Sequence, residues 1–267
     1  MPSPIVIYHD GCPDGTAAAW ATWTVFGAAA TYLPATYGSE PPPVVDPATN
    51  EPRDVIIVDF SYPRNALVKI AEEARSVIVL DHHKTARENC EGLPFCVFDM
   101  ERSGAGLAWD HFRAGDPRPW LIDYTEDRDL WRHALTSTRE VNAWLRSQPR
   151  TIEGYDLASA TPLDVARALG AEILAAERVY IESMKTRAAL AVIDGHVVPV
   201  VECGRHCASE IVGERSESHP FAASWELRDG AVCYSLRSRG DGLDVSTIAR
   251  RFGGGGLALC LCHSRHR

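Results

Sequence analysis

Two runs of purely apolar residues, each leading directly into an aspartate, constrain the fold of this chain more than any other feature. Residues 55–58 precede Asp59, and residues 77–80 precede Asp81. Apolar runs without polar alternation are typical of strands that are buried on both faces, as in a parallel sheet. Because helical patterns separate these runs, we expect an α/β domain with a mostly parallel sheet flanked by helices.

The pattern along the chain predicts two parts with different organisation. Strands are expected at residues 4–8, 31–37, 54–58, 76–80 and 95–98, and helices at 15–26, 63–75, 104–112 and 119–126. A long helix is expected from Thr161-Pro162, where Thr can cap and Pro fits the first turn, to about residue 190. Further strands are expected at 197–201, 221–227 and 231–236, with a turn at Asp229-Gly230 and a helix at 245–252. We therefore expect an α/β domain at 1–150, a linker helix region at 151–190 and a smaller α+β domain at 191–267.

Composition restricts the class of protein. The chain is 45% hydrophobic and 24% charged, and it contains no apolar run long enough to span a membrane. Its first residues lack the basic flank and apolar stretch of a signal peptide, so a cytoplasmic location is expected. The eight cysteines are then expected to be reduced thiols. A zinc site at Cys203 and Cys207, or at Cys260, Cys262 and His263, is disfavoured because the spacings differ from the usual CxxC pairs.

Potential metal ligands follow three of the expected strands. His9 ends the first strand, Asp59 follows the strand at 54–58, and Asp81 follows the strand at 76–80 together with two histidines. The carboxyl ends of parallel strands face one crevice, so these side chains should converge. A charged aspartate next to a desolvated core is costly unless it is paired or metal-bound. Asp59 has the alternative role of capping the next helix. Carboxylates with imidazoles suit manganese, iron, zinc or cobalt.

Four blocks of sequence resemble motifs I to IV of the DHH phosphoesterase family. They are HDGCPDG at residues 9–15, VDF at 58–60, LDHHKT at 80–85 and DRDLW at 127–131. A bare Asp-His-His tripeptide would be a weak signal, but here the four blocks also occur in the family's order and spacing. The resemblance implies two divalent cations, with manganese expected, and a metal-dependent hydrolase.

The resemblance assigns a role to each matching residue. It implies that His9 and Asp59 hold the first metal and that Asp59 bridges to the second. Ligands of the second metal are Asp14, Asp59, His82 and Asp127. Asp81 is expected to orient the site, and His83 to contact the phosphate or transfer a proton. Asp127 is preferred over Asp129 for the role of the fourth motif.

One position in the first motif departs from the family. Cys12 stands where the family usually has a second aspartate. The thiol can ligate the first metal as a thiolate, or that metal can bind weakly with His9 supplying most of the grip. The remaining alternative is an inert buried thiol.

The last part of the chain resembles the DHHA1-type domain that follows the catalytic domain in many family members. Substrate contacts are expected from Arg237 and Arg239, which can pair with phosphate, and from the glycine run Gly253, Gly254, Gly255 and Gly256. Relatives have a His after this run, whereas here residues 257–267 differ. A slip of the reading frame after the glycines is one hypothesis for that ending.

These observations favour a phosphodiesterase of small nucleotides or short oligonucleotides, an exonuclease-like activity. Two alternatives are a nucleotide phosphomonoesterase acting on a bisphosphate and a catalytically weak nucleotide-binding regulator. A pyrophosphatase or polyphosphatase is disfavoured because those relatives carry a different C-terminal domain. The net charge of −9 argues against tight binding of long duplex nucleic acid. No membrane partner is expected, a homodimer stays open, and Trp131 is the candidate for stacking on a base.

Overall fold

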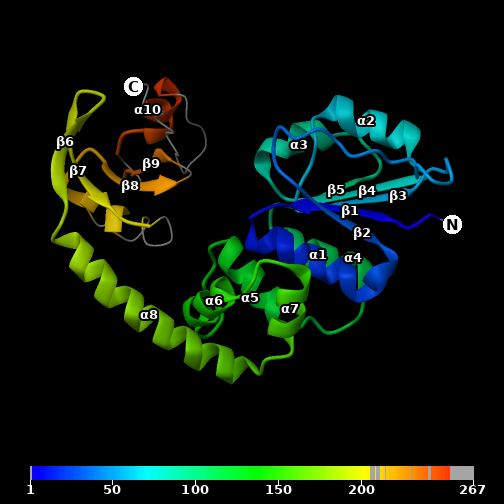
Figure 1. Cartoon of the computed structure of the whole chain (residues 1–267), viewed down its shortest axis with the longest axis horizontal. Helices are drawn as coiled ribbons and strands as arrows, with labels where there is room; N and C mark the ends of the chain where they lie inside the picture. Colours follow the sequence, from blue (N-terminus) through cyan, green and yellow to red (C-terminus); the bar gives the residue numbers. More distant parts are fainter. Residues whose placement is uncertain are drawn as a thin grey trace. The chain divides into compact units, whose positions relative to one another are not determined.

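The structure, a computed structural model, divides the chain into two compact units, Met1–Ile173 and Leu174–Arg267. It describes residues 2–204, 208, 211–213, 215–228, 230–239 and 242–252. Each unit contains its own sheet (Figure 1). The expected class, an α/β domain with a parallel sheet followed by a smaller α+β part, is confirmed. In the part of the chain that is described, no helix combines the length and the hydrophobicity needed to cross a membrane.

The first unit is built on a five-stranded sheet in which every neighbouring pair is parallel. Its strands, in the spatial order β2-β1-β3-β4-β5, are Thr31–Ala35, Ile5–His9, Asp54–Val58, Ser76–Asp81 and Cys96–Phe98. The register of β1 against β3 pairs Tyr8 with Val58, and β3 against β4 pairs Val58 with Leu80. Since these strands are parallel and in register, their carboxyl ends lie at one edge of the sheet, as the sequence predicts.

Helices cover both faces of this sheet (Figure 1). On one face are α2 and α3, with bounds Arg64–Glu73 and Lys84–Cys90. On the other are α1 and α4, Pro13–Phe26 and Gly104–Phe112, followed by α5, α6 and α7, Trp120–Asp129, Thr138–Ser147 and Ile152–Ser159. A short 3-10 turn, η1, Gly27–Ala29, links α1 to β2. Helices α3, α6 and α7 are not predicted from the sequence.

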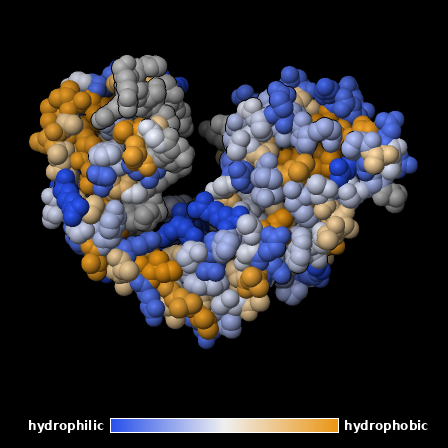
Figure 2. Space-filling view, viewed as in Figure 1, coloured by the Kyte–Doolittle hydropathy of each residue, from blue (hydrophilic) through white to orange (hydrophobic). Residues whose placement is uncertain are grey.

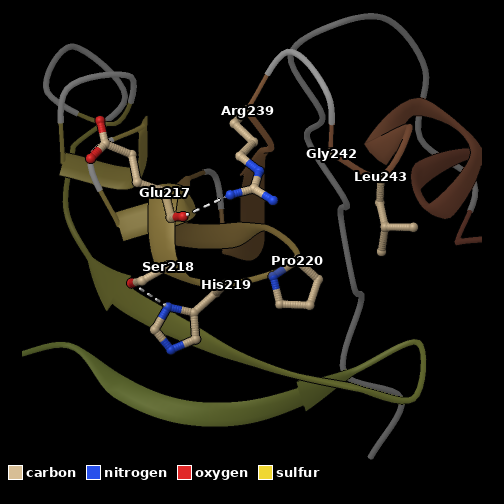
Figure 3. A pocket seen from close by; sticks show the side chains of 7 residues that line it. All are labelled: Glu217, Ser218, His219, Pro220, Arg239, Gly242 and Leu243. Carbon is tan, nitrogen blue, oxygen red and sulfur yellow. Dashed lines mark hydrogen bonds between the residues drawn. The ribbon is translucent and has the colours of Figure 1, made fainter.

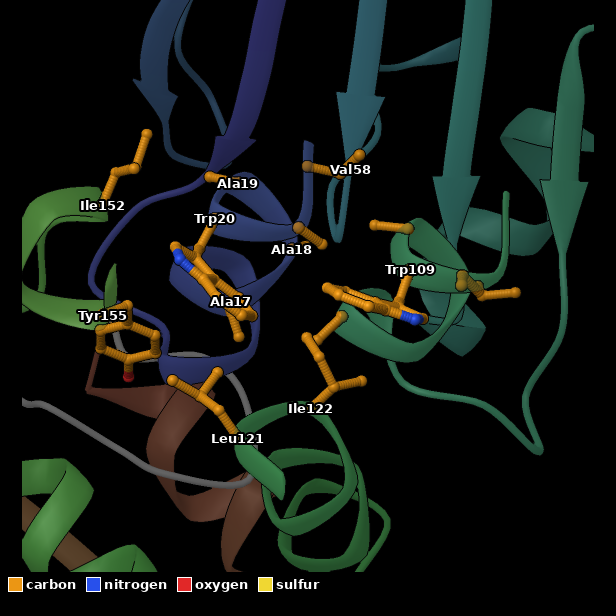
Figure 4. Close-up of a cluster of buried hydrophobic side chains, with 14 of the residues drawn as sticks. Ala17, Ala18, Ala19, Trp20, Val58, Trp109, Leu121, Ile122, Ile152 and Tyr155 are labelled. Atoms are coloured by element: carbon orange, nitrogen blue, oxygen red, sulfur yellow. The ribbon is translucent and has the colours of Figure 1, made fainter. Parts of the chain in front are cut away.

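Two hydrophobic cores explain why residues 55–58 of β3 are all apolar. Ile56 and Val58 belong to the core under α1 and α4, whereas Ile57 belongs to the core under α2. Alternate residues of a strand point to opposite faces, so the part of a strand that is covered on both sides is apolar. Within the first core, the rings of Trp20 and Trp109 stack with centroids 5.9 Å apart (Figure 4). This packing holds α1 and α4 against the sheet. Both helices begin at the edge where the strands end.

The second unit contains a four-stranded mixed sheet in the order β6-β7-β8-β9. The strands are Ala189–Ile193, His196–Glu202, Ala222–Arg228 and Ala231–Arg237. The pairs β6·β7 and β8·β9 are antiparallel, and β7·β8 is parallel. A 3-10 turn, η2, Ser216–Ser218, precedes β8, and helix α10, Val245–Arg251, follows β9. The antiparallel pairing of β8 with β9 agrees with the predicted hairpin, although Asp229 lies outside the described residues.

The predicted extent of the long helix is wrong at its C-terminal end. Helix α8 runs over Leu163–Lys185, and Ala189 and Leu190, the last residues expected in the helix, belong to β6, Ala189–Ile193. The apolar side chains of Leu190 and Val192 in β6, and of Val197 in β7, are exposed. Figure 2 shows the hydrophobic surface over these two strands. Hydropathy alone does not distinguish a helix from a strand in this segment. Its pairing with β7 makes it a strand.

Candidate metal centre

The imidazole of His82 faces carboxylates from three separate segments. Its Nε2 atom lies 3.1 Å from Asp59 Oδ1, 3.5 Å from Asp14 Oδ2 and 3.6 Å from Asp129 Oδ2. Burial opposes the charged form of His82, but the hydrogen bond and charge of Asp59 outweigh it and raise its pKa. Several anionic groups around one nitrogen are the arrangement expected where a cation binds.

Asp59 lies at the centre of the cluster and is fully buried. It follows β3 in a left-handed backbone conformation, with φ of 54°, so the chain turns sharply as the strand ends. Burial alone would raise its pKa, but His82, His9 and the charge of His83 hold the pKa well below its usual range. The N-cap of α2 is Pro63, so Asp59 does not cap that helix, the alternative that the sequence left open.

Asp14, in the first turn of α1, is held by the N-terminus of α4. Its carboxylate accepts hydrogen bonds from Gly104 N at 2.6 Å and Ala105 N at 3.0 Å. Ser103 caps α4 by accepting from Gly106 N. Burial, followed by the nearby charge of Asp59, raises the pKa of Asp14 well above its ordinary value. The helix N-terminus thus stabilises an acid that the rest of the cluster repels.

Asp81 orients both histidines that follow it. Its Oδ1 atom accepts hydrogen bonds from His82 N at 2.7 Å and His83 N at 3.1 Å, and lies 2.7 Å from His83 Nδ1. Burial lowers the pKa of His83, but the contact with Asp81 and the charge of Asp59 raise it to about 8. Because the carboxylate is an acceptor, the Nδ1 atom of His83 carries its proton toward Asp81, and Nε2 is left for other contacts.

A second group of potential ligands adjoins the first. Ligand atoms of His9, Cys12 and Asp59 lie within 4.8 Å of one another. The ligand atoms of two further groups lie equally close to one another: those of Asp59, His82 and His83, and those of Asp14, His82 and Asp129. Burial, then the charges of Asp59 and Asp14, raises the pKa of the Cys12 thiol. Asp59 is therefore shared by two neighbouring groups of potential ligands, one with His9 and Cys12 and the other with His82 and His83.

The structure places the two acids of the fourth motif, Asp127 and Asp129, in different surroundings. Asp127 accepts hydrogen bonds from Ala134 N at 2.9 Å and Leu135 N at 3.2 Å, and from the hydroxyl of Thr138. Its carboxylate is thus committed to the segment after α5. Asp129, at the last residue of α5, is the acid that faces His82. Two residues apart on a helix point about 200° apart, so only one of the pair can reach the cluster.

The expected substrate contacts lie in the second unit. Arg237 Nη1 donates to Leu236 O at 2.9 Å, and Arg239 Nη1 donates to Glu217 O at 3.1 Å. Arg239 also lines a pocket of about 530 Å³ with Glu217, Ser218, His219, Pro220, Gly242 and Leu243 (Figure 3). Gly253, Gly254, Gly255 and Gly256 lie outside the described residues.

Sequence reasoning missed two residues that shape the centre. A Cβ at Gly104 would come within 2.4 Å of Asp59 Cβ, so only glycine allows α4 to approach so closely. The Tyr37 ring lies edge-on to His9, with centroids 5.3 Å apart, and 6.1 Å from that of His83. The Ser-Gly-Ala-Gly start of α4 was the available signal for Gly104. Tyr37 follows β2 and has no local signature.

The residues present fit divalent cations. Asp59 Oδ2 and His9 Nδ1 are buried without a hydrogen-bond partner among the described residues, although 3.6 Å separates them. Buried polar atoms in proteins are almost always satisfied, so such a pair indicates a ligand between or beside them. Imidazole nitrogens and carboxylate oxygens are suitable donors for manganese and related ions.

Solved structures with the same fold include RecJ proteins. A RecJ exonuclease bound to manganese has a TM-score of 0.55 and 16% identity, covering 98% of this chain and 86% of its own. Thermus thermophilus RecJ in complex with Mn²⁺ has a TM-score of 0.51 and 15% identity, covering 98% and 50%. An exopolyphosphatase-related protein from Bacteroides fragilis has a TM-score of 0.52 and 12% identity, covering 100% and 88%. The chain thus shares the fold of these proteins and of a solved DHH domain with a TM-score of 0.51 and 12% identity, covering 97% of this chain and 82% of its own.

A sequence relative comes from Acanthamoeba polyphaga mimivirus. This uncharacterized protein is 28% identical over 275 residues, which cover 94% of the present chain. The chain spans 65% of the length of that relative. No family model matches the chain.

Proposed function

We propose that this protein is a metal-dependent phosphodiesterase that hydrolyses small nucleotides or short oligonucleotides. The observation that carries the proposal is the convergence of Asp14, Asp59 and Asp129 on His82 Nε2. The solved RecJ structures bound to manganese support the choice of cation and of a phosphate ester substrate. In this proposal residues 1–150 form the catalytic part, 151–190 the linker, and 191–267 the part that holds the rest of the substrate.

The proposed cofactor is a pair of divalent cations, with manganese as the first to test. Bound cations of this kind supply Lewis-acid activation of water and neutralise charge on the phosphoryl group. Asp59 would serve both positions, because Oδ1 faces His82 and Oδ2 faces His9. Asp14, His82 and Asp129 complete one position, with Asp129 in place of Asp127. Asp81 orients the two histidines by accepting hydrogen bonds from His82 N and His83 Nδ1.

His83 is the proposed residue for moving a proton. Its Nδ1 is held by Asp81, so Nε2 is the atom that can contact a phosphoryl oxygen or protonate the leaving oxygen. In the metal-free protein, the contact with Asp81 and the charge of Asp59 outweigh burial and raise the pKa of His83 to about 8. General acid catalysis by one positioned side chain typically contributes about 10²–10⁴-fold.

Exposed aromatic rings support a nucleotide as the substrate. Tyr37 is 52% exposed while its ring contacts those of His9 and His83. Trp131 is 70% exposed and follows Asp129 by two residues. Large aromatics are normally buried, and exposed ones beside a phosphate site can stack on bases. Trp20, Trp109 and Trp144, in contrast, are buried in the core of the first unit.

The test is a substrate panel with the metal-stripped full chain, to which manganese is returned. The panel contains a dinucleotide, short oligonucleotides, a cyclic dinucleotide, an adenosine bisphosphate and pyrophosphate, and products are separated by chromatography. We expect nucleoside monophosphates from the dinucleotide and the oligonucleotides, and none with Asp59→Ala. Release of phosphate from the bisphosphate alone would replace the proposal with a phosphomonoesterase. Manganese binding with no product across the panel would contradict an enzymatic role.

A further inference from the structure

The two sides of Asp59 offer chemically different ligands. On one side are Asp14, His82 and Asp129, which present only nitrogen and oxygen. On the other are His9 and Cys12, which add a sulfur to the shared carboxylate. Thiolate favours softer ions of the zinc class, whereas carboxylate and imidazole suit manganese. The two sides of the centre therefore differ in the softness of their ligand atoms, on which the preference for one metal over another depends.

Cys12 is fixed in position rather than carried on a loose loop. It is the N-cap residue of α1, and its carbonyl oxygen accepts hydrogen bonds from Thr16 N and Thr16 Oγ1, both at 3.0 Å. Gly11 before it adopts a positive φ of 65°, and its carbonyl accepts from Arg150 Nη1 at 2.8 Å. Cys12 is a half-buried free thiol. These contacts hold Cys12 beside His9 and Asp59.

Unsatisfied atoms on this side indicate a ligand independently of the cysteine. Asp59 Oδ2 and His9 Nδ1 are both buried, and neither has a hydrogen-bond partner among the described residues. Asp59 itself is fully buried, so bulk solvent does not reach its carboxylate. Three protein ligands with an open fourth position are the usual set at a catalytic zinc.

We propose that His9, Cys12 and Asp59 hold a zinc-class cation while Asp14, His82 and Asp129 share Asp59 around a harder ion such as manganese. The proposal rests on the proposed function, because it divides the same centre between two metals. On binding, the S–H bond of Cys12 breaks, a bond from Sγ to the cation forms, and the proton passes to solvent. No oxidant or reductant is needed.

Cobalt(II) spectroscopy tests the sulfur ligand directly. The metal-stripped full chain is titrated with Co²⁺, and the near-ultraviolet thiolate-to-cobalt charge-transfer band is recorded. We expect the band in the wild type and in Cys96→Ala, a control that removes another half-buried thiol of the same unit. We expect no band in Cys12→Ser. Cobalt bound without the band in the wild type would overturn the assignment of Cys12 and leave the metal centre standing. A wild type that binds no cobalt would instead contradict the proposed function.

Metal content gives a second measurement, and alkylation keeps the test independent of any variant. After equilibration with equal zinc and manganese, mass spectrometry should find both metals in the wild type and mainly manganese in Cys12→Asp. Equal contents in the two proteins would overturn the proposal. In the wild type, zinc should protect Cys12 from iodoacetamide, as read from its peptide, whereas manganese should not. Alkylation of Cys12 at the same rate with zinc as without metal would also overturn it.

Discussion

The Cα of Gly104 lies so close to Asp59 that a side chain between them has no room. An added Cβ would be 2.4 Å from Asp59 Cβ and 2.6 Å from its Oδ1. The same residue donates its N–H to Asp14. One glycine therefore brings the start of α4 against two of the four acids of the candidate centre and sets the distance between them.

Gly104→Ala should damage both stability and activity. The obstacle is backbone and the buried carboxylate rather than a flexible chain end, so overpacking should cost about 1–3 kcal/mol. The free energy of unfolding by urea measures this cost, and hydrolysis of the best panel substrate measures the activity. Gly213→Ala is the matched control, because nothing lies within 4 Å of its added Cβ. Equal stability of the two variants would show that α4 can shift away without loss.

The two acids of the fourth motif should separate into one that serves the metal and one that serves the fold. Asp129→Asn should weaken manganese binding, measured by calorimetry, and lower turnover by about 10²-fold or more, by analogy with loss of one charge-stabilising group. Asp127→Asn should instead destabilise the protein by about 1–3 kcal/mol, because it weakens three hydrogen bonds to the segment after α5. Loss of manganese affinity only in the Asp127 variant would restore the original assignment from sequence.

Some features of the candidate centre could be predicted from the sequence and others could not, and each outcome has a physical reason. The ends of β1, β3 and β4 could be predicted to converge, because a strand buried on both faces belongs to a parallel sheet with a common edge. The ranking of Asp127 above Asp129 rested on the family resemblance, because the direction of α5, which decides the acid that faces His82, is set by packing. The approach of Gly104 to Asp59 joins segments far apart in sequence. The end of α8 was missed because Leu190 is apolar in a strand as it would be in a helix.

Replacement of the exposed aromatics should weaken nucleotide binding without unfolding the protein. Trp131→Ala and Tyr37→Ala should each raise the KM for an oligonucleotide, since stacking on one base contributes about 1–3 kcal/mol. Tyr37→Phe should keep most of the affinity, because a phenyl ring also stacks. Leu157→Ala is a control that truncates another exposed apolar side chain. An unchanged KM in both alanine variants would remove base stacking from the proposed function.

Acid should remove the contribution of the ion pair at the other end of β3. The hydrogen bond from Arg75 lowers the pKa of Asp54, burial opposes it, and Ser76 lowers it further. A carboxyl whose pKa is lower in the folded state stabilises the fold above its unfolded pKa of about 3.9, and this contribution disappears as the pH falls through the folded pKa. Asp54→Asn should therefore be less stable than the wild type at neutral pH, and the difference should shrink on acidification.

Urea unfolding of the metal-free protein across this pH range measures the difference. Arg75→Gln should show the same loss at neutral pH, and the double variant should show little more, because both changes remove one interaction. A difference between Asp54→Asn and the wild type that does not depend on pH would mean that the ion pair contributes nothing to the linkage.

The separation of the ligands among three strand ends has a consequence for how such a centre can change over generations. His9 is the last residue of β1, whereas Asp59 and His82 follow β3 and β4 of the same rigid sheet, so replacing one ligand leaves the backbone under the others in place. A single codon change at Cys12 could then alter which ion from the cell's metal supply the protein recruits, while the hydrophobic layers stay intact. A new metal preference could therefore evolve without a change of fold and without an unstable intermediate sequence.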